Sequence, residues 1–316
     1  MHSILPPHLA TSHSLPDFRS LIVQGCYPPA APIHLCLSHL SSELPTNKAL
    51  LISSSKQYLS SELEEYNDAW LAQHAGDGTV AEHLHQIDIF YPPTYRHLRL
   101  LLARLRTYST PNTDADSETD LKACLSRPPT LLILHELSRY FLSPQLAGDL
   151  DIQEIQLPTL STYMQFVIDA IAALQFLSSS DKSLAPPRLV IFDKELHTLA
   201  LPIVRPVNLA DINKLPKQHK ANVTDVLQRY IGWVATVEKV ENEEIPSSQT
   251  DEIEIDTEEV DNEGAPDRAH FRMTLQKSPS ATVKPIIEEQ TFEWYSYRDP
   301  YEPPFTPRRQ TIVVPL

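Results

Sequence analysis

A seven-residue segment, Thr130 to Glu136 (TLLILHE), constrains the fold of this chain more than any other stretch. Five apolar or β-prone residues run without interruption into the polar pair His135 and Glu136. Such a run is typical of a strand that is buried on both faces of a parallel sheet, and the two prolines just before it favour a strand over a core helix. We therefore expect its polar end at the carboxyl edge of an open α/β sheet, where such sheets bind ligands.

The rest of the chain alternates short apolar runs with amphipathic segments, as in a parallel sheet with crossover helices. The expected strands are 19–25, 48–53, 87–91, 130–136, 188–192 and 197–204, and the expected helices are 33–44, 62–73, 94–106 and 160–177. The segment 33–44 could instead be a strand, because Ile33, Leu35 and Leu37 alternate. Pro32 at its start favours a helix. Three later segments, 230–240, 270–276 and 289–295, have the pattern of antiparallel strands appended to this core.

Composition predicts one α/β core with flexible additions. We expect a flexible arm over 1–18, a core over 19–240 with a disordered insertion at about 107–128, an acidic disordered insertion over 241–267, C-terminal strands of the core over 268–296 and an extended tail over 297–316. Between Glu238 and Glu263, twelve acidic residues and one lysine account for −11 of the net charge of −15 and leave −4 for the remainder. A block of this kind is typical of a solvated insertion, and an acidic tether that mimics DNA or docks a basic partner stays open.

The cysteine and hydropathy patterns predict a soluble protein of the nucleus or cytosol. Cys26, Cys36 and Cys124 have no paired spacing, which suits a reducing compartment. No apolar run has the pattern of a membrane span or a signal peptide, so we expect no membrane partner. His34 and the pair His83-x-His85 are candidates for a metal, but no cluster has ligand spacing, and we expect none.

The first expected strand ends at Gly25, where a nucleotide-binding loop would begin. A Walker A loop has the form G-x-x-x-x-G-K-[ST], because flexible backbone amides surround the phosphates while Lys and Ser/Thr hold charge and Mg²⁺. The chain has GCYPPAAP, which places Ala30, Ala31 and Pro32 where the second glycine, the lysine and the hydroxyl should stand. The prolines also remove donors, so this register predicts that phosphate binding is lost.

The order of these segments resembles a RecA-type ATPase core, and two further positions lack the catalytic side chains of that family. In the second strand, the aromatic Tyr58 aligns Ser55 with the water-activating glutamate of that family. In the strand 130–136, His135 stands in place of the metal-directing aspartate, and Glu136 comes one residue late. The segments IFYPPT and LLILHELSRYF resemble small RecA-like recombinase paralogues of the Shu type, which pair with a SWIM-domain protein. The resemblance covers roughly residues 19–205.

This resemblance implies an α/β RecA-like P-loop core and a non-catalytic subunit of a recombination mediator complex. It implies a RecA-like or SWIM-domain protein partner, contact with the recombinase filament and with single-stranded DNA, a nuclear location and no cofactor. A basic loop after the strand that ends at Asp193 could follow a phosphate backbone. The DNA-binding candidates are Arg139, Lys194, Lys214, Lys217 and Lys220.

Three alternatives stay open. The chain could be an Elongator-type RecA-like ring subunit in tRNA modification, which also lacks Walker signatures. It could be an active ATPase with an unrecognised nucleotide loop, although six glycines in the whole chain leave little material for one. Finally, His135 and Glu136 could be a proton-transfer pair in a cleft.

Overall fold

The structure, a computed structural model, describes residues 2–9, 14–41, 47–107, 124–142, 159–178, 186–203, 220–240, 268–278, 289–298 and 311–315. Its centre is a nine-stranded sheet in the order β13-β12-β11-β10-β1-β7-β6-β2-β3. The strands are β1 (Ser20–Gly25), β2 (Ala49–Ser53), β3 (Ile87–Phe90), β6 (Leu131–His135), β7 (Arg188–Asp193), β10 (Trp233–Val240), β11 (Arg268–Lys277), β12 (Glu289–Arg298) and β13 (Thr311–Pro315). Pairing is parallel from β10 to β3 and antiparallel from β10 to β13.

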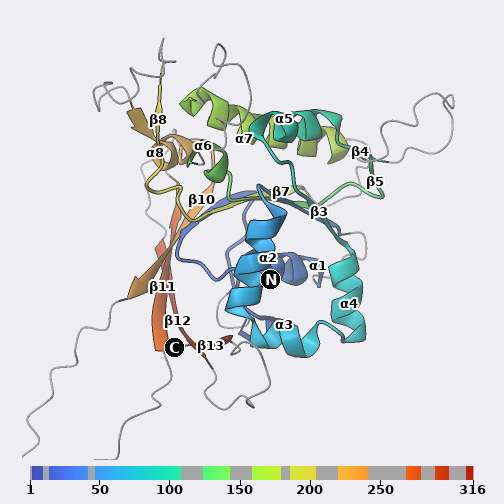
Figure 1. The fold of residues 1–316 in the computed structure, drawn as a ribbon, viewed down its shortest axis with the longest axis vertical. Helices are drawn as coiled ribbons and strands as arrows, with labels where there is room; N and C mark the ends of the chain where they lie inside the picture. Colours follow the sequence, from blue (N-terminus) through green and yellow to red (C-terminus); the bar gives the residue numbers. More distant parts are fainter. Residues whose placement is uncertain are drawn as a thin grey trace, which may run out of the picture.

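Helices cover both faces of this sheet (Figure 1). One layer contains α5 (Tyr95–Arg104), α6 (Arg139–Leu142), α7 (Leu160–Ser178) and α8 (Val223–Leu227), and the other contains α1 (Ala31–Leu40), α2 (Lys56–Tyr66), α3 (Ala69–His74) and α4 (Gly78–His85). Two small sheets flank them: β4 (Arg106–Thr107) pairs with β5 (Cys124–Leu125), and β8 (Ala200–Pro202) pairs with β9 (Lys220–Asn222). The protein is thus an α/β fold with a mostly parallel sheet and C-terminal antiparallel strands.

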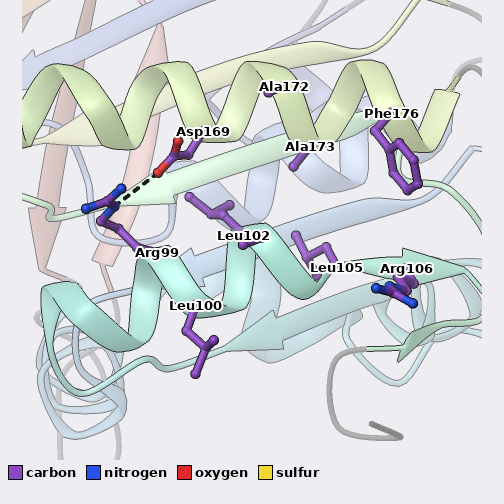
Figure 2. A pocket seen from close by; sticks show the side chains of 10 residues that line it. Arg99, Leu100, Leu102, Leu105, Arg106, Asp169, Ala172, Ala173 and Phe176 are labelled. Carbon is purple, nitrogen blue, oxygen red and sulfur yellow. Dashed lines mark hydrogen bonds and ion pairs between the residues drawn. The ribbon is translucent and has the colours of Figure 1, made fainter.

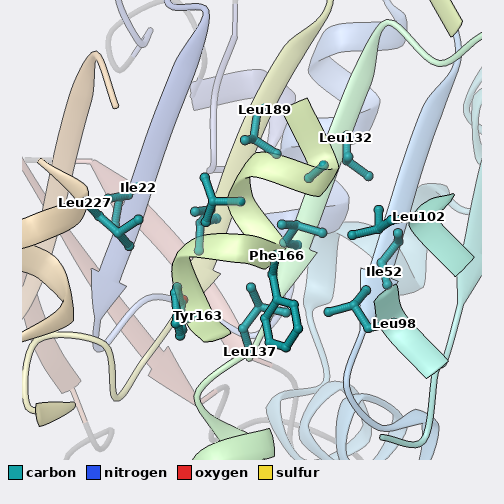
Figure 3. Packing of buried hydrophobic residues seen from close by; sticks show 14 of the residues in the cluster. Ile22, Ile52, Leu98, Leu102, Leu132, Leu137, Tyr163, Phe166, Leu189 and Leu227 are labelled. Atoms are coloured by element: carbon teal, nitrogen blue, oxygen red, sulfur yellow. The ribbon is translucent and has the colours of Figure 1, made fainter. Parts of the chain in front are cut away.

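The central strands are apolar on both faces because each face has its own core. On β6, Leu132 and Leu134 pack with α5 and α7, and Figure 3 shows Phe166 of α7 among them. The intervening residues Leu131 and Ile133 pack against α1 in a second cluster. The unbroken apolar run of β6 is therefore the consequence of burial from two sides.

The N-terminal segment differs from the flexible arm that its composition predicts. Its apolar side chains Ile4, Leu5, Leu15 and Phe18 are buried in the cluster that contains α1. The backbone N–H of Ser3 also donates to Ser38 Oγ of α1, at 3.0 Å. The segment therefore covers α1, and its short 3-10 helix η1 (Pro7–Leu9) belongs to the fold.

Several elements differ from the expected boundaries. The first helix is confirmed as a helix and excludes the strand alternative. The helix expected over 62–73 is two helices, because Asn67 adopts a left-handed φ of 46° and Asp68 caps α3 by accepting from Leu71 N–H at 2.8 Å. Helix α4 (Gly78–His85) lies in a stretch where no helix was expected.

The C-terminal part of the sheet also differs. Strand β10 was expected to be antiparallel, but it pairs parallel with β1 and antiparallel with β11. Residues 311–315 of the expected tail form the edge strand β13. In the expected insertion at 107–128, Leu125 is buried in the core. The acidic insertion 241–267 lies outside the described residues.

Candidate functional site

The site predicted from sequence lies at the carboxyl edge of β1, the fifth of the nine strands in the sheet. The chain leaves β1 at Gly25, passes through a short loop and enters α1 at Ala31. Gly25 has a φ of 87°, and a Cβ added to it would lie 2.2 Å from the carbonyl oxygen of Val237. Gly25 therefore permits the close approach of β10 and the turn into the loop.

The backbone amides of this loop are engaged within the protein. The Cys26 N–H donates to Val237 O at 2.8 Å, and the Ala31 N–H donates to Pro28 O at 2.9 Å. The amides of Ile33 and His34, in the first turn of α1, both donate to Ala30 O. The prolines of this stretch have no N–H to offer: Pro28, Pro29 and Pro32. A phosphate-binding loop needs several free, convergent amides, and most of the amides here are bonded or missing.

A tyrosine side chain fills the edge beside this loop. Tyr27 is buried, and its hydroxyl donates to Glu136 Oε1 at 2.5 Å. Glu136, which follows β6, has a left-handed φ of 55°, a conformation that is uncommon for a residue other than glycine. Its N–H donates to Phe192 O at 2.7 Å, and the N–H of Lys194 donates to its carboxylate at 3.3 Å. Bonds to Tyr27, which follows β1, and to β7 and the residue after it thus hold this strained residue in place.

A second buried carboxyl group, Asp193, lies at the end of β7. Its Oδ2 accepts from the Ser138 N–H at 2.8 Å and from the Tyr163 hydroxyl at 3.3 Å. Burial raises the pKa of Asp193 to about 6. Burial, together with the nearby Asp193 carboxylate, raises the pKa of Glu136 to about 7. Both carboxyl groups therefore hold protons to a higher pH than usual.

The neighbouring histidine is neutral. Burial and the charges of Lys194 and Arg139 lower the pKa of His135 to about 3. Its Nδ1 shares a hydrogen bond of 3.0 Å with Ser53 Oγ, and its Nε2 lies 4.0 Å from Glu136 Oε1. His135 is 0% exposed and Glu136 is 1% exposed. A proton-transfer pair so enclosed has no route to a substrate, so this arrangement favours a structural role.

Charged side chains from α2 and α6 cover the edge. Lys194 Nζ lies 2.5 Å from Glu62 Oε1, and the Tyr58 hydroxyl donates to the same carboxylate. The Arg139 guanidinium stacks 3.5 Å from the centre of the Tyr58 ring. Ser55, which aligns with a catalytic glutamate in the resemblance above, is the N-cap of α2 and accepts from the Tyr58 N–H at 3.2 Å.

Most residues of the predicted nucleotide site do meet at this edge, but the DNA-binding candidates are dispersed. Arg139 and Lys194 belong to the cover just described. Lys220 is exposed in β9, in a separate small sheet. Lys214 and Lys217 lie outside the described residues. Where the structure describes side chains, it brings together no group of three or more His, Cys, Asp or Glu placed to hold a metal ion.

Several members of this site have little or no signal in the sequence that predicts them. These are Tyr27 in the loop after β1, Glu62 in α2 and Tyr163 in α7. They contact Glu136, Lys194 and Asp193 because the sheet order brings these segments to one edge. The one local signal was available for Tyr27, which stands two residues after the glycine that ends β1.

The chain matches no family model and no curated protein sequence. By length and composition α7 could cross a membrane, a property that it shares with core helices of soluble proteins. Here its residues Phe166, Val167 and Ala170 pack onto the sheet as part of the core.

Proposed function

We propose that this protein is a non-catalytic RecA-like subunit that works by binding other molecules, within a recombination mediator complex. The observation that carries the proposal is the state of the loop after β1. By resemblance its register is that of a phosphate loop, but most of its amides are bonded or missing, and Tyr27 is hydrogen-bonded to Glu136 beside it. A protein whose loop does not bind phosphates cannot hydrolyse ATP, so its fold would act by binding other molecules.

The sheet order supports the RecA-like part of the proposal. The resemblance implies a mostly parallel sheet with helices on both faces, and this sheet has both features. Here β1 lies between β7 and β10, and β2 lies three positions away beyond β7 and β6. The three positions that by resemblance lack the family's chemical groups each lie at or just after the carboxyl end of a strand: Ala31 after β1, Ser55 after β2 and His135 in β6.

The proposed partners are a RecA-like or SWIM-domain protein, the recombinase filament and single-stranded DNA. Among the described candidates for DNA contact, Lys220 is the exposed one, whereas Lys194 is ion-paired with Glu62 and Arg139 is stacked on Tyr58. The DNA contact would therefore centre on the region of Lys220, which also follows Lys214 and Lys217 in sequence.

Titration with Mg²⁺·ATP tests the non-catalytic part of the proposal. We expect no binding by the full chain, because too few loop amides are available for the phosphates. Micromolar affinity would overturn the proposal in favour of an active ATPase.

Binding to a labelled single-stranded oligonucleotide, measured at several salt concentrations, tests the DNA part. We expect Lys220→Glu to weaken binding a few-fold and to reduce the salt dependence by about one phosphate contact. Lys56→Glu, which changes an exposed lysine in the opposite helix layer, is the matched control. Equal effects of both variants, or none, would argue against this DNA site. Co-purification with Elongator subunits instead of recombination proteins would replace the recombination role with one in tRNA modification.

A further inference from the structure

Helix α7 has too few charges for a helix that faces solvent. Asp169 is its one charged residue, and only 33% of its most apolar stretch is buried. Its inner side packs on the sheet, but Ile168 and Phe176 on its outer side are 53% and 65% exposed. A solvent-facing helix normally carries polar and charged residues on its outer side, so this apolar side indicates a contact surface.

The surface next to this apolar side is hollowed. A cavity of about 560 Å³ lies between α5 and α7, and its apolar lining includes Leu100, Leu102, Ala172 and Phe176 (Figure 2). A second cavity of about 510 Å³ lies along α7 and is lined by Ile171, Leu174 and Gln175 together with residues at the start of β1 and β7. The C-terminal half of α7 therefore contributes to two cavities large enough to receive side chains.

The lining of the first cavity contains two arginines, Arg99 and Arg106, and one acidic residue, Asp169, so it is positive on balance, in contrast to the chain as a whole. Helix α5 contains Arg96, Arg99 and Arg104 and no acidic residue, and Arg106 follows it directly. Figure 2 shows Arg99 and Arg106 at opposite ends of the cavity. Arg99 lies 3.3 Å from Asp169 and keeps 53% of its side chain exposed. Apolar residues between two arginines match a segment that is apolar in the middle and acidic at its flanks.

We propose that the surface formed by α5 and α7, the α5–α7 surface, binds an acidic amphipathic helix of a partner protein. Apolar side chains of that helix would enter the cavity between α5 and α7, and its acidic residues would pair with Arg99 and Arg106. Since α5 has ten residues, it is about 15 Å long, and a partner helix of about three turns would span it. This inference deepens the proposed function by naming the surface and the chemistry of a protein partner, and it does not depend on DNA binding.

Photo-crosslinking in the cells that express the full chain tests this inference. A benzoylphenylalanine replaces Phe176, and in a control protein it replaces Ile203, which is 52% exposed and lines neither cavity. Mass spectrometry then identifies the cross-linked peptide. We expect the Phe176 position, and not the Ile203 position, to cross-link to a segment with apolar residues at helical spacing and acidic flanks.

Two further variants separate a specific contact from general stickiness. Once the cross-linked segment is known, its synthetic peptide should bind the wild-type chain, and Arg106→Glu and Ile168→Glu should each weaken this binding about tenfold or more. Ile203→Glu, at an equally exposed isoleucine, should leave it unchanged, and thermal unfolding verifies that all variants are folded.

The alternative outcomes each overturn the inference: cross-linking to lipid, to a second copy of this chain or to a basic segment, or no cross-link at all. The failure of the proposed function is distinguishable. A specific cross-link to an acidic helix of a protein outside recombination would keep the α5–α7 surface and refute the recombination role. Co-purification of recombination proteins without this cross-link would do the reverse.

Discussion

Gly25 meets two independent constraints at the end of β1. Its φ of 87° disfavours any L side chain, and a Cβ there would lie 2.2 Å from a backbone oxygen of β10 that cannot move without disturbing the sheet. We expect Gly25→Ala to lower the free energy of unfolding by about 3 kcal/mol, measured by urea denaturation. Gly232→Ala is the control, because its new Cβ would lie at an ordinary 3.5 Å from Ser20 O, and it should change stability by less than about 1 kcal/mol. Equal effects would show that the close approach is unimportant.

The buried carboxyl group of Glu136 predicts a pH dependence of stability. Because its pKa is raised from 4.5 to about 7, the folded protein retains this proton to higher pH than the unfolded chain does. The stabilisation is therefore present below pH 4.5 and is lost as the pH rises through 7, with a loss on the order of 3 kcal/mol. Glu136→Gln, which cannot ionise, should gain stability relative to wild type between pH 5 and pH 8.

The quantity to measure is the free energy of unfolding of Glu136→Gln minus that of wild type at each pH. His135 acts in the opposite direction, because its pKa is lowered from 6.5 to about 3, so its contribution is lost as the pH falls below 6.5. Subtracting the two unfolding curves removes the contribution of His135, and the difference reports Glu136 together with Asp193, whose carboxylate raises the pKa of Glu136. The exposed Glu82→Gln serves as the control and should give a flat difference. A flat difference for Glu136→Gln as well would mean that solvent reaches the site.

At this scale, the sequence predicted which strand ends are polar but not their partners. His135 and Glu136 are at the expected edge because a buried apolar run must end where the backbone meets polar groups. The partners of Glu136, namely Tyr27 and Lys194, come from β1 and β7, and their contact depends on a strand order that no local pattern specifies.

At the scale of elements, burial explains both what could be predicted and what could not. Strands such as β6 were predictable because burial from two sides requires an unbroken apolar run. The break between α2 and α3 depends on one left-handed residue, Asn67, and one capping side chain, Asp68. Such single-residue signals are weak beside the apolar spacing that continues across them.

The N-terminal segment gives an element-scale prediction. Its few apolar residues lack periodicity, yet they cover α1, and Leu5 is 1% exposed. We expect Leu5→Ala to lower the free energy of unfolding by about 3 kcal/mol, measured by chemical denaturation, because it leaves a cavity in this cluster. His8→Ala, at an exposed position of the same segment, should be nearly neutral. Similar small effects of both variants would indicate that the N-terminal segment is the flexible arm that composition predicts.

At the scale of the whole molecule, the sheet combines two topologies around β1. The alternation of strands and helices predicted the parallel part, because crossover connections require it. The parallel pairing of β10 with β1 could not be predicted, since β10 has the same local pattern whichever strand it joins. Its partner on the other side, β11, fixes the direction of the C-terminal strands.

This topology makes the segment between β10 and β11 removable. Val240 is paired with His270 in an antiparallel ladder, so the two strands that a shorter link must join lie side by side. We expect that replacing 241–267 with a four-residue Gly/Ser link keeps the fold and leaves the free energy of unfolding unchanged or raises it by about 1–2 kcal/mol, because loop closure becomes less costly. Thermal and urea unfolding measure this, and a scrambled segment of the original length and charge is the control. Unfolding of the shortened chain alone would show that the acidic segment contributes to the core. A folded chain that retains its partner would instead place binding on surfaces such as the α5–α7 surface, where Arg99 and Arg106 lie.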